Sequence, residues 1–243
     1  MSRVVLLGAT GTIGRATAAA LLAHGYDVVG FVRPGALAAE HPGLPDDVEL
    51  REVDLFDADA VGRDGFGGEP VDAVVSCMAS RSGAARDAWA VDFEAHRTVL
   101  DAAEAGGVRQ FVLLSAICVQ RPRLEFQRAK LAFEEALTAS GLDWSIVRAT
   151  AFFKSLSGQV DRVRRGKPYL IFGDGRLNAC KPIAAEDLAD FLVTCLNDPG
   201  RRNRVLPIGG PGPALTPRDQ GELLFRAAGV EPRFRSVPVG LLR

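Results

Sequence analysis

Short apolar runs alternate with amphipathic stretches along much of the chain. The apolar runs predict β-strands over residues 3–7, 27–32, 48–53, 73–77, 110–114 and 144–147. Apolar residues at helical spacing predict α-helices over residues 12–24, 86–105, 125–139, 156–165, 185–197 and 217–228. The glycine- and proline-containing stretches 33–47 and 62–70 are expected to be loops. Strands that alternate with helices are typical of βαβ units, so the pattern predicts a parallel sheet.

Three glycines at a G-x-x-G-x-x-G spacing follow the first predicted strand. Gly8 would permit a tight turn, Gly11 would let the backbone approach a pyrophosphate, and Gly14 would let the next helix press against the sheet. The amino end of that helix offers free N–H groups to phosphates. The expected cofactor contacts of this turn are Gly8, Thr10, Gly11, Thr12, Ile13 and Gly14. A tight strand-to-helix turn without a ligand is the alternative.

The glycine motif and the strand–helix alternation together predict a Rossmann-like α/β fold with a doubly wound parallel sheet. We assign residues 1–150 to an NADP-binding Rossmann domain. Beyond Arg148 the pattern loosens, and glycine and proline become frequent. Residues 151–243 are therefore expected to form a smaller, C-terminal substrate-binding lobe. The glycine spacing resembles that of the extended and atypical short-chain dehydrogenase/reductases.

The composition narrows the class of protein. The 243 residues are 47% hydrophobic and 24% charged, with a formal net charge of −1, so nothing indicates nucleic-acid binding. No apolar run reaches the roughly 20 residues of a membrane span, and the first strand leaves no room for a signal peptide. Peripheral membrane contact and the oligomeric state stay open. The four scattered cysteines argue against a metal site and favour a cytoplasmic location.

The second predicted strand ends in an arginine, Arg33. A site selective for NAD usually has an acid there, whereas an arginine can pair with a 2′-phosphate, so NADP is favoured. Arg15 could be a second phosphate partner, and a solvated loop charge is the alternative for Arg33. The ends of the third and fourth strands supply further expected cofactor contacts: Asp54, Leu55, Cys77, Met78 and Ala79.

The helix after the fifth strand lacks a tyrosine. Short-chain dehydrogenases that act on alcohols use Tyr-x-x-x-Lys, which places both side chains on one helix face. Here Phe126 and Lys130 occupy these positions, and phenylalanine cannot donate a proton. Lys130 can still hold the cofactor ribose and is the one catalytic candidate, although a surface lysine is the alternative. Hydride delivery to a conjugated carbon–carbon double bond remains open to such a site.

Several longer segments resemble a known family: residues 114–120, 124–131, 147–156, 172–175 and 180–183. They are similar to the divinyl chlorophyllide 8-vinyl reductases, which are NADPH-dependent atypical short-chain reductases of chlorophyll and bacteriochlorophyll synthesis. The resemblance covers essentially the whole chain, and Phe126 belongs to the family pattern. Ala149 departs from it, because many relatives have proline there. Family members continue beyond Arg243, so part of a substrate lid is expected to be absent.

The resemblance implies that NADPH reduces the C8 vinyl group of divinyl protochlorophyllide or divinyl chlorophyllide to ethyl. Hydride on the outer vinyl carbon would leave charge that the macrocycle delocalises. The proton donor is open among Lys130, Glu125, Lys154 and solvent. The resemblance adds Ser115, Lys130, Thr150 and Phe152 as cofactor contacts. It implies as substrate contacts Phe126, Phe153, Lys154, Phe172 and Lys181, with Phe152 a further candidate wall of the pigment slot.

Three other functions stay open. A sugar-nucleotide epimerase or dehydratase would share the fold, but those reactions normally need the tyrosine that Phe126 replaces. A non-enzymatic NADP-binding redox sensor or structural subunit would need only the nucleotide site. A reductase of another conjugated alkene, such as an isoflavone or lignan, would share the chemistry but not the segments around Phe172 and Cys180.

Overall fold

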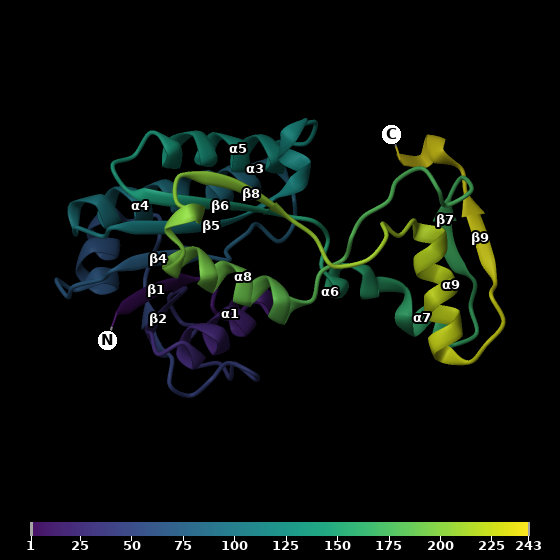
Figure 1. Cartoon of the computed structure of the whole chain (residues 1–243), viewed down its shortest axis with the longest axis horizontal. Coiled ribbons are helices and arrows are strands. Elements are labelled where there is room, and N and C mark those ends of the chain that lie inside the picture. The colour runs from purple at the N-terminus through teal and green to yellow at the C-terminus, as the bar shows by residue number, and fades with distance from the viewer. Residues whose placement is uncertain (1, 243) are drawn as a thin grey trace. The chain divides into compact units, whose positions relative to one another are not determined.

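The computed structural model describes residues 2–242, and within them seven parallel strands form one sheet in the order β3-β2-β1-β4-β5-β6-β8 (Figure 1). The strands are β1 (Arg3–Leu7), β2 (Asp27–Val32), β3 (Glu49–Glu52), β4 (Ala73–Ser76), β5 (Gln110–Ala116), β6 (Asp143–Ala149) and β8 (Arg204–Ile208). This arrangement confirms the predicted Rossmann-like, doubly wound sheet. The strand order reverses between β1 and β4, which opens a crevice at the carboxyl ends of these strands.

Helices cover both faces of the sheet. The helices are α1 (Thr12–Ala23), α2 (Ala58–Ala60), α3 (Ala85–Ala88), α4 (His96–Ala105), α5 (Glu125–Thr138), α6 (Phe153–Leu156), α7 (Val160–Arg164), α8 (Ala185–Asn197) and α9 (Pro217–Ala228). Figure 1 shows α3, α4 and α5 on one face and α1 and α8 on the other. Because helices bury both faces, β1 is a continuous apolar run with Val4 to Leu7 fully buried.

Three sequence-based expectations for secondary structure need correction. Residues 62–70 were expected to be a loop, but Val61–Phe66 is π-helical, because Phe66 packs edge-on against Phe31 at 5.7 Å between ring centroids. The helix expected over 86–105 contains a π-helical segment, Trp89–Ala95, between α3 and α4. The helix expected over 156–165 is broken by the 3₁₀ turn Ser157–Gln159.

The chain forms two compact units, and the first unit is discontinuous. Unit 1 comprises residues 1–149 and 185–208, and unit 2 comprises residues 150–184 and 209–243. The segment 185–208 therefore differs from the expected division at residue 150. It joins unit 1 because β8 pairs in parallel with β6, while α8 packs against α1 and buries its apolar face, including Leu188 and Leu192.

Unit 2 has a small core of its own. The strands β7 (Tyr169–Phe172) and β9 (Phe234–Val237), which the sequence pattern did not predict, pair in parallel. Val163, Tyr169, Ile171 and Phe225 form the buried cluster. Gly221 lets α9 approach this sheet, since a Cβ there would lie 2.5 Å from a ring carbon of Phe234. The proposed role of this unit as a substrate-binding lobe stays a prediction.

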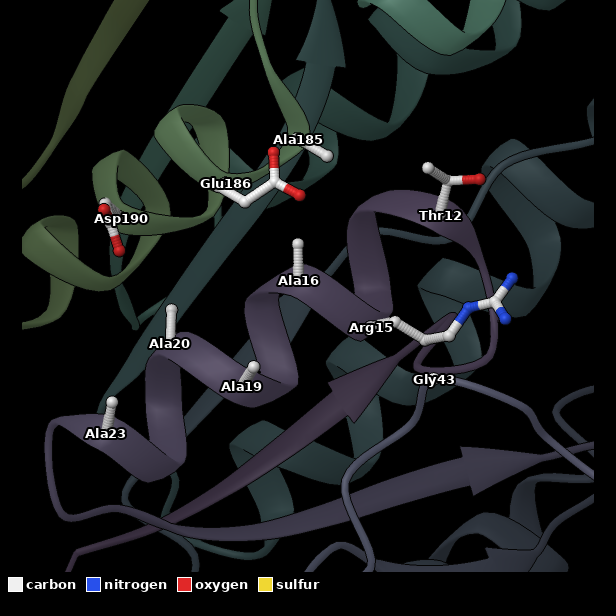
Figure 2. A pocket seen from close by; sticks show the side chains of 10 residues that line it. All are labelled: Thr12, Arg15, Ala16, Ala19, Ala20, Ala23, Gly43, Ala185, Glu186 and Asp190. Carbon is white, nitrogen blue, oxygen red and sulfur yellow. The ribbon is translucent and has the colours of Figure 1, made fainter.

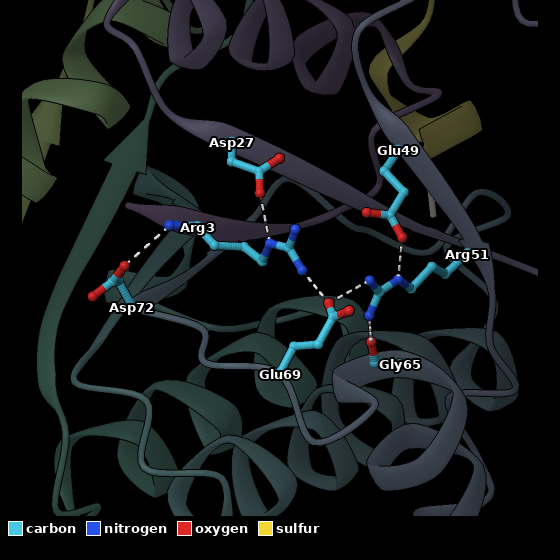
Figure 3. Close-up of polar contacts among 7 residues, drawn as sticks. All are labelled: Arg3, Asp27, Glu49, Arg51, Gly65, Glu69 and Asp72. Carbon is cyan, nitrogen blue, oxygen red and sulfur yellow. Dashed lines mark hydrogen bonds and ion pairs between the residues drawn. The ribbon is translucent and has the colours of Figure 1, made fainter. Parts of the chain in front are cut away.

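A polar network joins the amino ends of the strands in unit 1, at the edge opposite the crevice (Figure 3). Arg3 Nε donates to Asp27 at 2.6 Å, Arg51 Nη2 donates to Glu69 at 2.6 Å, and Arg3 also pairs with Glu69. The Arg3 N–H donates to Asp72 at 3.0 Å. These partly exposed pairs join the start of β1 to the starts of its neighbours β2 and β4 and to the segment that follows the π-helix Val61–Phe66. The network lies far from the carboxyl ends of the strands.

Candidate functional site

A cavity of about 670 Å³ lies at the carboxyl ends of β1, β2, β3 and β4 in unit 1. Its lining includes many of the residues that the sequence assigns to a cofactor: Gly8, Thr10, Gly11, Arg33, Asp54, Leu55, Cys77, Met78 and Ala79. These residues follow four different strands, and the parallel sheet brings them together at one edge. Their roles in binding stay predictions, but their convergence fits a nucleotide.

The glycine turn is closely packed at Gly8 and at Gly14, and the role of Gly11 beside a pyrophosphate stays a prediction. Gly8 has a φ of +75°, and a Cβ on it would lie 2.9 Å from the backbone of Cys77 and Met78. A Cβ on Gly14 would lie 2.0 Å from the carbonyl oxygen of Gly8. The N-cap of α1, Gly11, has no side-chain cap, so the first N–H groups of the helix are free for an anion.

Two residues of this motif point elsewhere. The side chain of Ile13 is buried in the core, so any contact with a cofactor would be made by its backbone. Thr12 lines a second cavity, of about 570 Å³, and not the first. Figure 2 shows this second cavity between the alanine side chains of α1 and the acids Glu186 and Asp190 of α8. Of the candidate residues, Thr12 and Arg15 line it, and Arg15 also lines the first cavity.

The charged groups of the main cavity differ in how they are held. Within residues 2–242, Arg33 is exposed and makes no hydrogen bond or ion pair with a side chain. Arg15 is instead tied to the loop over 33–47, because its guanidinium donates to the carbonyl oxygen of Pro42. Asp54 is exposed and accepts the N–H of Phe56 at 3.0 Å. Arg33 is therefore the freer cation for an incoming phosphate.

The segment after β4 is held from behind by a buried histidine. His96 Nδ1 donates to the carbonyl oxygen of Val91 at 2.8 Å, so the neutral ring accepts the Ser76 hydroxyl at Nε2, at 2.7 Å. The Met78 N–H donates to Ser76 Oγ at 3.3 Å. Burial lowers the pKa of His96 to about 4, and the positive charge of Lys130 adds to this effect. His96 thus joins two walls of the cavity, Met78 and Val91.

The depressed pKa of His96 predicts acid sensitivity of folding. Between a folded pKa of about 4 and an unfolded value of roughly 6.5, the unfolded chain binds more protons, so stability is lost as the pH falls. We expect the free energy of unfolding to drop by about 2 kcal/mol from pH 7 to pH 5 through this group. Urea unfolding at both values should show this loss in the native protein and less of it in His96→Gln. The control His24→Gln, an exposed histidine, should keep the full loss.

Three further residues that the sequence assigns to the cofactor site, Cys77, Lys130 and Ser115, are each buried or engaged in a hydrogen bond. Burial raises the pKa of the Cys77 thiol to about 12, which leaves it protonated and suited to packing beneath the glycine turn. Lys130 does not line the cavity, and its Nζ donates to Asp92 Oδ1 at 2.9 Å. Ser115 lies outside the lining too, because its hydroxyl donates to the buried carboxylate of Glu134 at 2.5 Å. Arg148 Nη2 pairs with the same carboxylate at 2.5 Å.

The expected substrate residues lie in both units. Phe126 is half-buried on α5 of unit 1. In unit 2, the Thr150 hydroxyl donates to the carbonyl oxygen of Lys181, and Phe152 bridges to Ile183. Unit 2 also carries Phe153, Lys154 and Phe172, which are exposed, as is the Lys181 side chain. The cofactor and substrate roles of these residues stay predictions.

Sequence reasoning missed several residues of the site. Phe56, Arg81 and Val91 line the cavity, while the acids Asp92 and Glu134 are buried outside its lining and bind Lys130 and Ser115. Asp92 and His96 stand four residues apart, which places them on one face of a helix and was an available signal for a buried polar pair. For Phe56 and Arg81 the only signal was their position after a strand.

Two negative findings hold for residues 2–242. In that range no group of three or more histidines, cysteines, aspartates or glutamates is placed to hold a metal ion. Over the same range no helix has the length and apolar character needed to cross a membrane.

Comparisons with known proteins agree with this nucleotide site. The sequence is 51% identical to the chloroplastic divinyl chlorophyllide a 8-vinyl-reductase of Oryza sativa subsp. indica, over 98% of this chain and 62% of that protein. It is 45% identical to the protein of the same name from Arabidopsis thaliana, over 98% of this chain and 60% of that protein. The chain thus spans about three fifths of the length of these relatives.

The structure is similar to UDP-glucose 4-epimerase of Thermotoga maritima, crystallised with UDP-glucose, with a TM-score of 0.84 at 20% identity. That match covers 98% of this chain and 87% of the other, and it shows the shared fold. The NAD(P)H-binding family matches residues 8–199, which contain the glycine turn and the whole of the cavity. This chain therefore belongs to the NAD(P)H-binding family.

Proposed function

We propose that this chain reduces the C8 vinyl group of divinyl chlorophyllide or divinyl protochlorophyllide to ethyl, with NADPH as the hydride source. The 51% identity to the rice reductase over nearly the whole chain carries the proposal. Phe126, in the position where alcohol-oxidising relatives have tyrosine, supports it. A site without that phenol is suited to a conjugated double bond, which takes up the charge left by hydride addition.

The residues of the cavity account for how the cofactor would be held. The backbone around Gly8 and Gly11 and the free first turn of α1 would bind the pyrophosphate. Arg33 would pair with the 2′-phosphate, and Asp54 would contact the adenine. NADPH, when bound, supplies the hydride. The walls at Met78 and Ala79 would then hold the nicotinamide half against the substrate and keep water away.

The selection of NADPH predicts a clear effect of Arg33. We expect Arg33→Ser to raise the Kd for NADPH about 10- to 100-fold, because a hydrogen-bonded pair with a charged group is lost. The Kd for NADH should change little. Titration of nicotinamide fluorescence measures both constants. The control is Arg97→Ser. Arg97 is an exposed arginine on α4 that pairs with Asp101, so its loss should change neither Kd. Equal losses for NADPH and NADH would contradict the assigned role.

The function is tested by adding divinyl protochlorophyllide and NADPH to the purified chain. A blue shift of the Soret band is the expected result, and 4R- or 4S-deuterated NADPH should place deuterium on the outer carbon of the new ethyl group. Label on the inner carbon would reject the proposed polarity. NADPH binding without turnover favours a redox sensor or structural subunit. Divinyl chlorophyllide in a parallel assay shows which pigment is preferred.

The compartment is a further part of the proposal. The described cysteines, Cys77, Cys118, Cys180 and Cys195, are all unpaired. We infer a reducing compartment, and we place this chain in the cytoplasm, whereas the plant relatives are named as chloroplastic. Thiol titration of protein taken directly from cells should find all four cysteines reduced.

A further inference from the structure

We propose that Asp92 is a positioning residue that holds the segment 76–80 in the shape needed by the nicotinamide half of the cofactor. This inference rests on the proposed NADPH site. Asp92 lies in the π-helical segment Trp89–Ala95, and its side chain is fully buried. It does not itself line the cavity, but its helical neighbours Val91 and Ala95 do.

The carboxylate of Asp92 gathers three donors. Its Oδ2 accepts the Ser80 hydroxyl at 2.6 Å, and its Oδ1 accepts the Ser80 N–H at 3.3 Å. The same Oδ1 accepts Lys130 Nζ at 2.9 Å, from α5. Lys130 is itself only 12% exposed. One buried charge thus joins the end of the segment after β4 to the helix that follows β5.

Burying an ion pair in a core carries a large desolvation free energy. Two charges lose their hydration, and apolar side chains of similar volume often stabilise a fold as well or better. Stability therefore gives little reason to have Asp92 and Lys130 here. The partner of Asp92 that reaches the cavity is Ser80, which lines it together with Met78 and Ala79. The geometry therefore favours a role in shaping this wall.

His96 supports the same segment at its other end. His96 holds Ser76 and, through it, the Met78 N–H, while Asp92 holds Ser80. Both residues belong to one helical stretch that packs beside α5. The segment 76–80 is thus held at Ser76 and at Ser80 by side chains of the same helical stretch. Its opposite side can then face a ligand. Lys130 acts here through Asp92 and not as a separate cation.

The glycine turn makes no hydrogen bond with Asp92 or Ser80. It meets the segment 76–80 at the backbone of Cys77 and Met78, near the end of the segment that follows β4, and not at Ser80, which Asp92 holds. Loss of Asp92 should therefore weaken the nicotinamide half of the site more than the adenosine half. This difference separates local positioning from general damage to the fold.

The experiment measures the Kd of NADPH and of 2′,5′-ADP, which lacks the nicotinamide half, for the whole chain and for Asp92→Asn. We expect Asp92→Asn to weaken NADPH binding about 10-fold and to leave 2′,5′-ADP binding within about twofold. Lys130→Met should have a similar effect, and the double variant should be no weaker than either single variant. The control is Asp101→Asn, an exposed acid on α4, which should change neither constant.

The outcomes are separable. Equal weakening of both ligands by Asp92→Asn, or no weakening of either, overturns the proposal for Asp92. Failure of the unchanged chain to bind either ligand instead overturns the proposed NADPH site. If Asp92→Asn does not fold, Ser80→Ala replaces it, since that change removes the 2.6 Å hydrogen bond and leaves the Lys130 pair intact. Ser80→Ala must then weaken NADPH binding and spare 2′,5′-ADP.

Discussion

Replacing Gly14 with alanine is expected to abolish nucleotide binding and to lower the free energy of unfolding of unit 1 by more than about 3 kcal/mol. The new Cβ would lie 2.0 Å from the oxygen and 2.7 Å from the carbon of the Gly8 carbonyl group. Gly8 has little room to shift on the side of its Cα hydrogen, because a Cβ built there would lie 2.9 Å from the backbone of Cys77 and Met78. Helix α1 would have to move away from the turn that forms the phosphate site.

Unfolding in urea, followed by tryptophan fluorescence, measures this effect. Both tryptophans, Trp89 and Trp144, belong to unit 1, so the signal reports on that unit. The matched control is Gly62→Ala, because Gly62 is also helical but a Cβ there meets nothing within 4 Å. It should change stability by less than about 1 kcal/mol. Unaltered NADPH affinity in Gly14→Ala would refute the packing argument.

The second large effect is expected at Glu134. Its carboxylate is only 4% exposed and accepts hydrogen bonds from both Ser115 and Arg148. Glu134→Ala would leave the guanidinium of Arg148, itself 17% exposed, without its counter-charge. Removal of one partner of a buried pair typically costs about 3–5 kcal/mol, so we expect a loss of that size.

The neighbouring glutamate provides the control for this experiment. Glu135 is on the same helix but exposed, and Glu135→Ala should stay within about 0.5 kcal/mol of the native protein. Urea unfolding with the same fluorescence signal compares the two variants. A loss below about 1 kcal/mol in Glu134→Ala would show that Arg148 finds water or another partner when the carboxylate is removed.

The central sheet could be predicted from the sequence because its strands are buried on both faces. Strands such as β1 and β2 therefore read as unbroken apolar runs, and their bounds were found to the residue. Helix α9 was also bounded correctly, since Thr216 caps its start and Gly229 ends it in a left-handed conformation. In these elements the local sequence signals and the tertiary packing favour the same bounds.

Elements that depend on distant contacts were missed. Strand β8 lies at the sheet edge, is mostly exposed and contains Pro207, so its sequence does not resemble that of a buried strand. The π-helix Val61–Phe66 contains two glycines, which favour a loop until Phe66 finds Phe31. Neither the pairing of β8 with β6 nor the contact of Phe66 with Phe31 can be predicted from the residues next to them in sequence.

The same distinction applies to the site. Residues at the ends of strands were found because a parallel sheet places those ends together. The partners of Lys130 and Ser115 were not found, because Asp92 is 38 residues from Lys130 and Glu134 is 19 residues from Ser115. Which donor each buried acid meets depends on how the π-helical segment Trp89–Ala95, α5 and β5 pack, and periodicity alone does not specify that packing.

The insertion of residues 150–184 between β6 and α8 has a consequence for synthesis on the ribosome. When residue 149 emerges, β6 is an open sheet edge, and the apolar surface that α8 later covers on α1 is still exposed to water. The surface on α1 stays exposed until translation has passed residue 197, and the edge of β6 stays open until it has passed residue 208. A nascent chain paused in that interval is a natural client for a chaperone, and a release near residue 149 should favour aggregation over a smaller folded product.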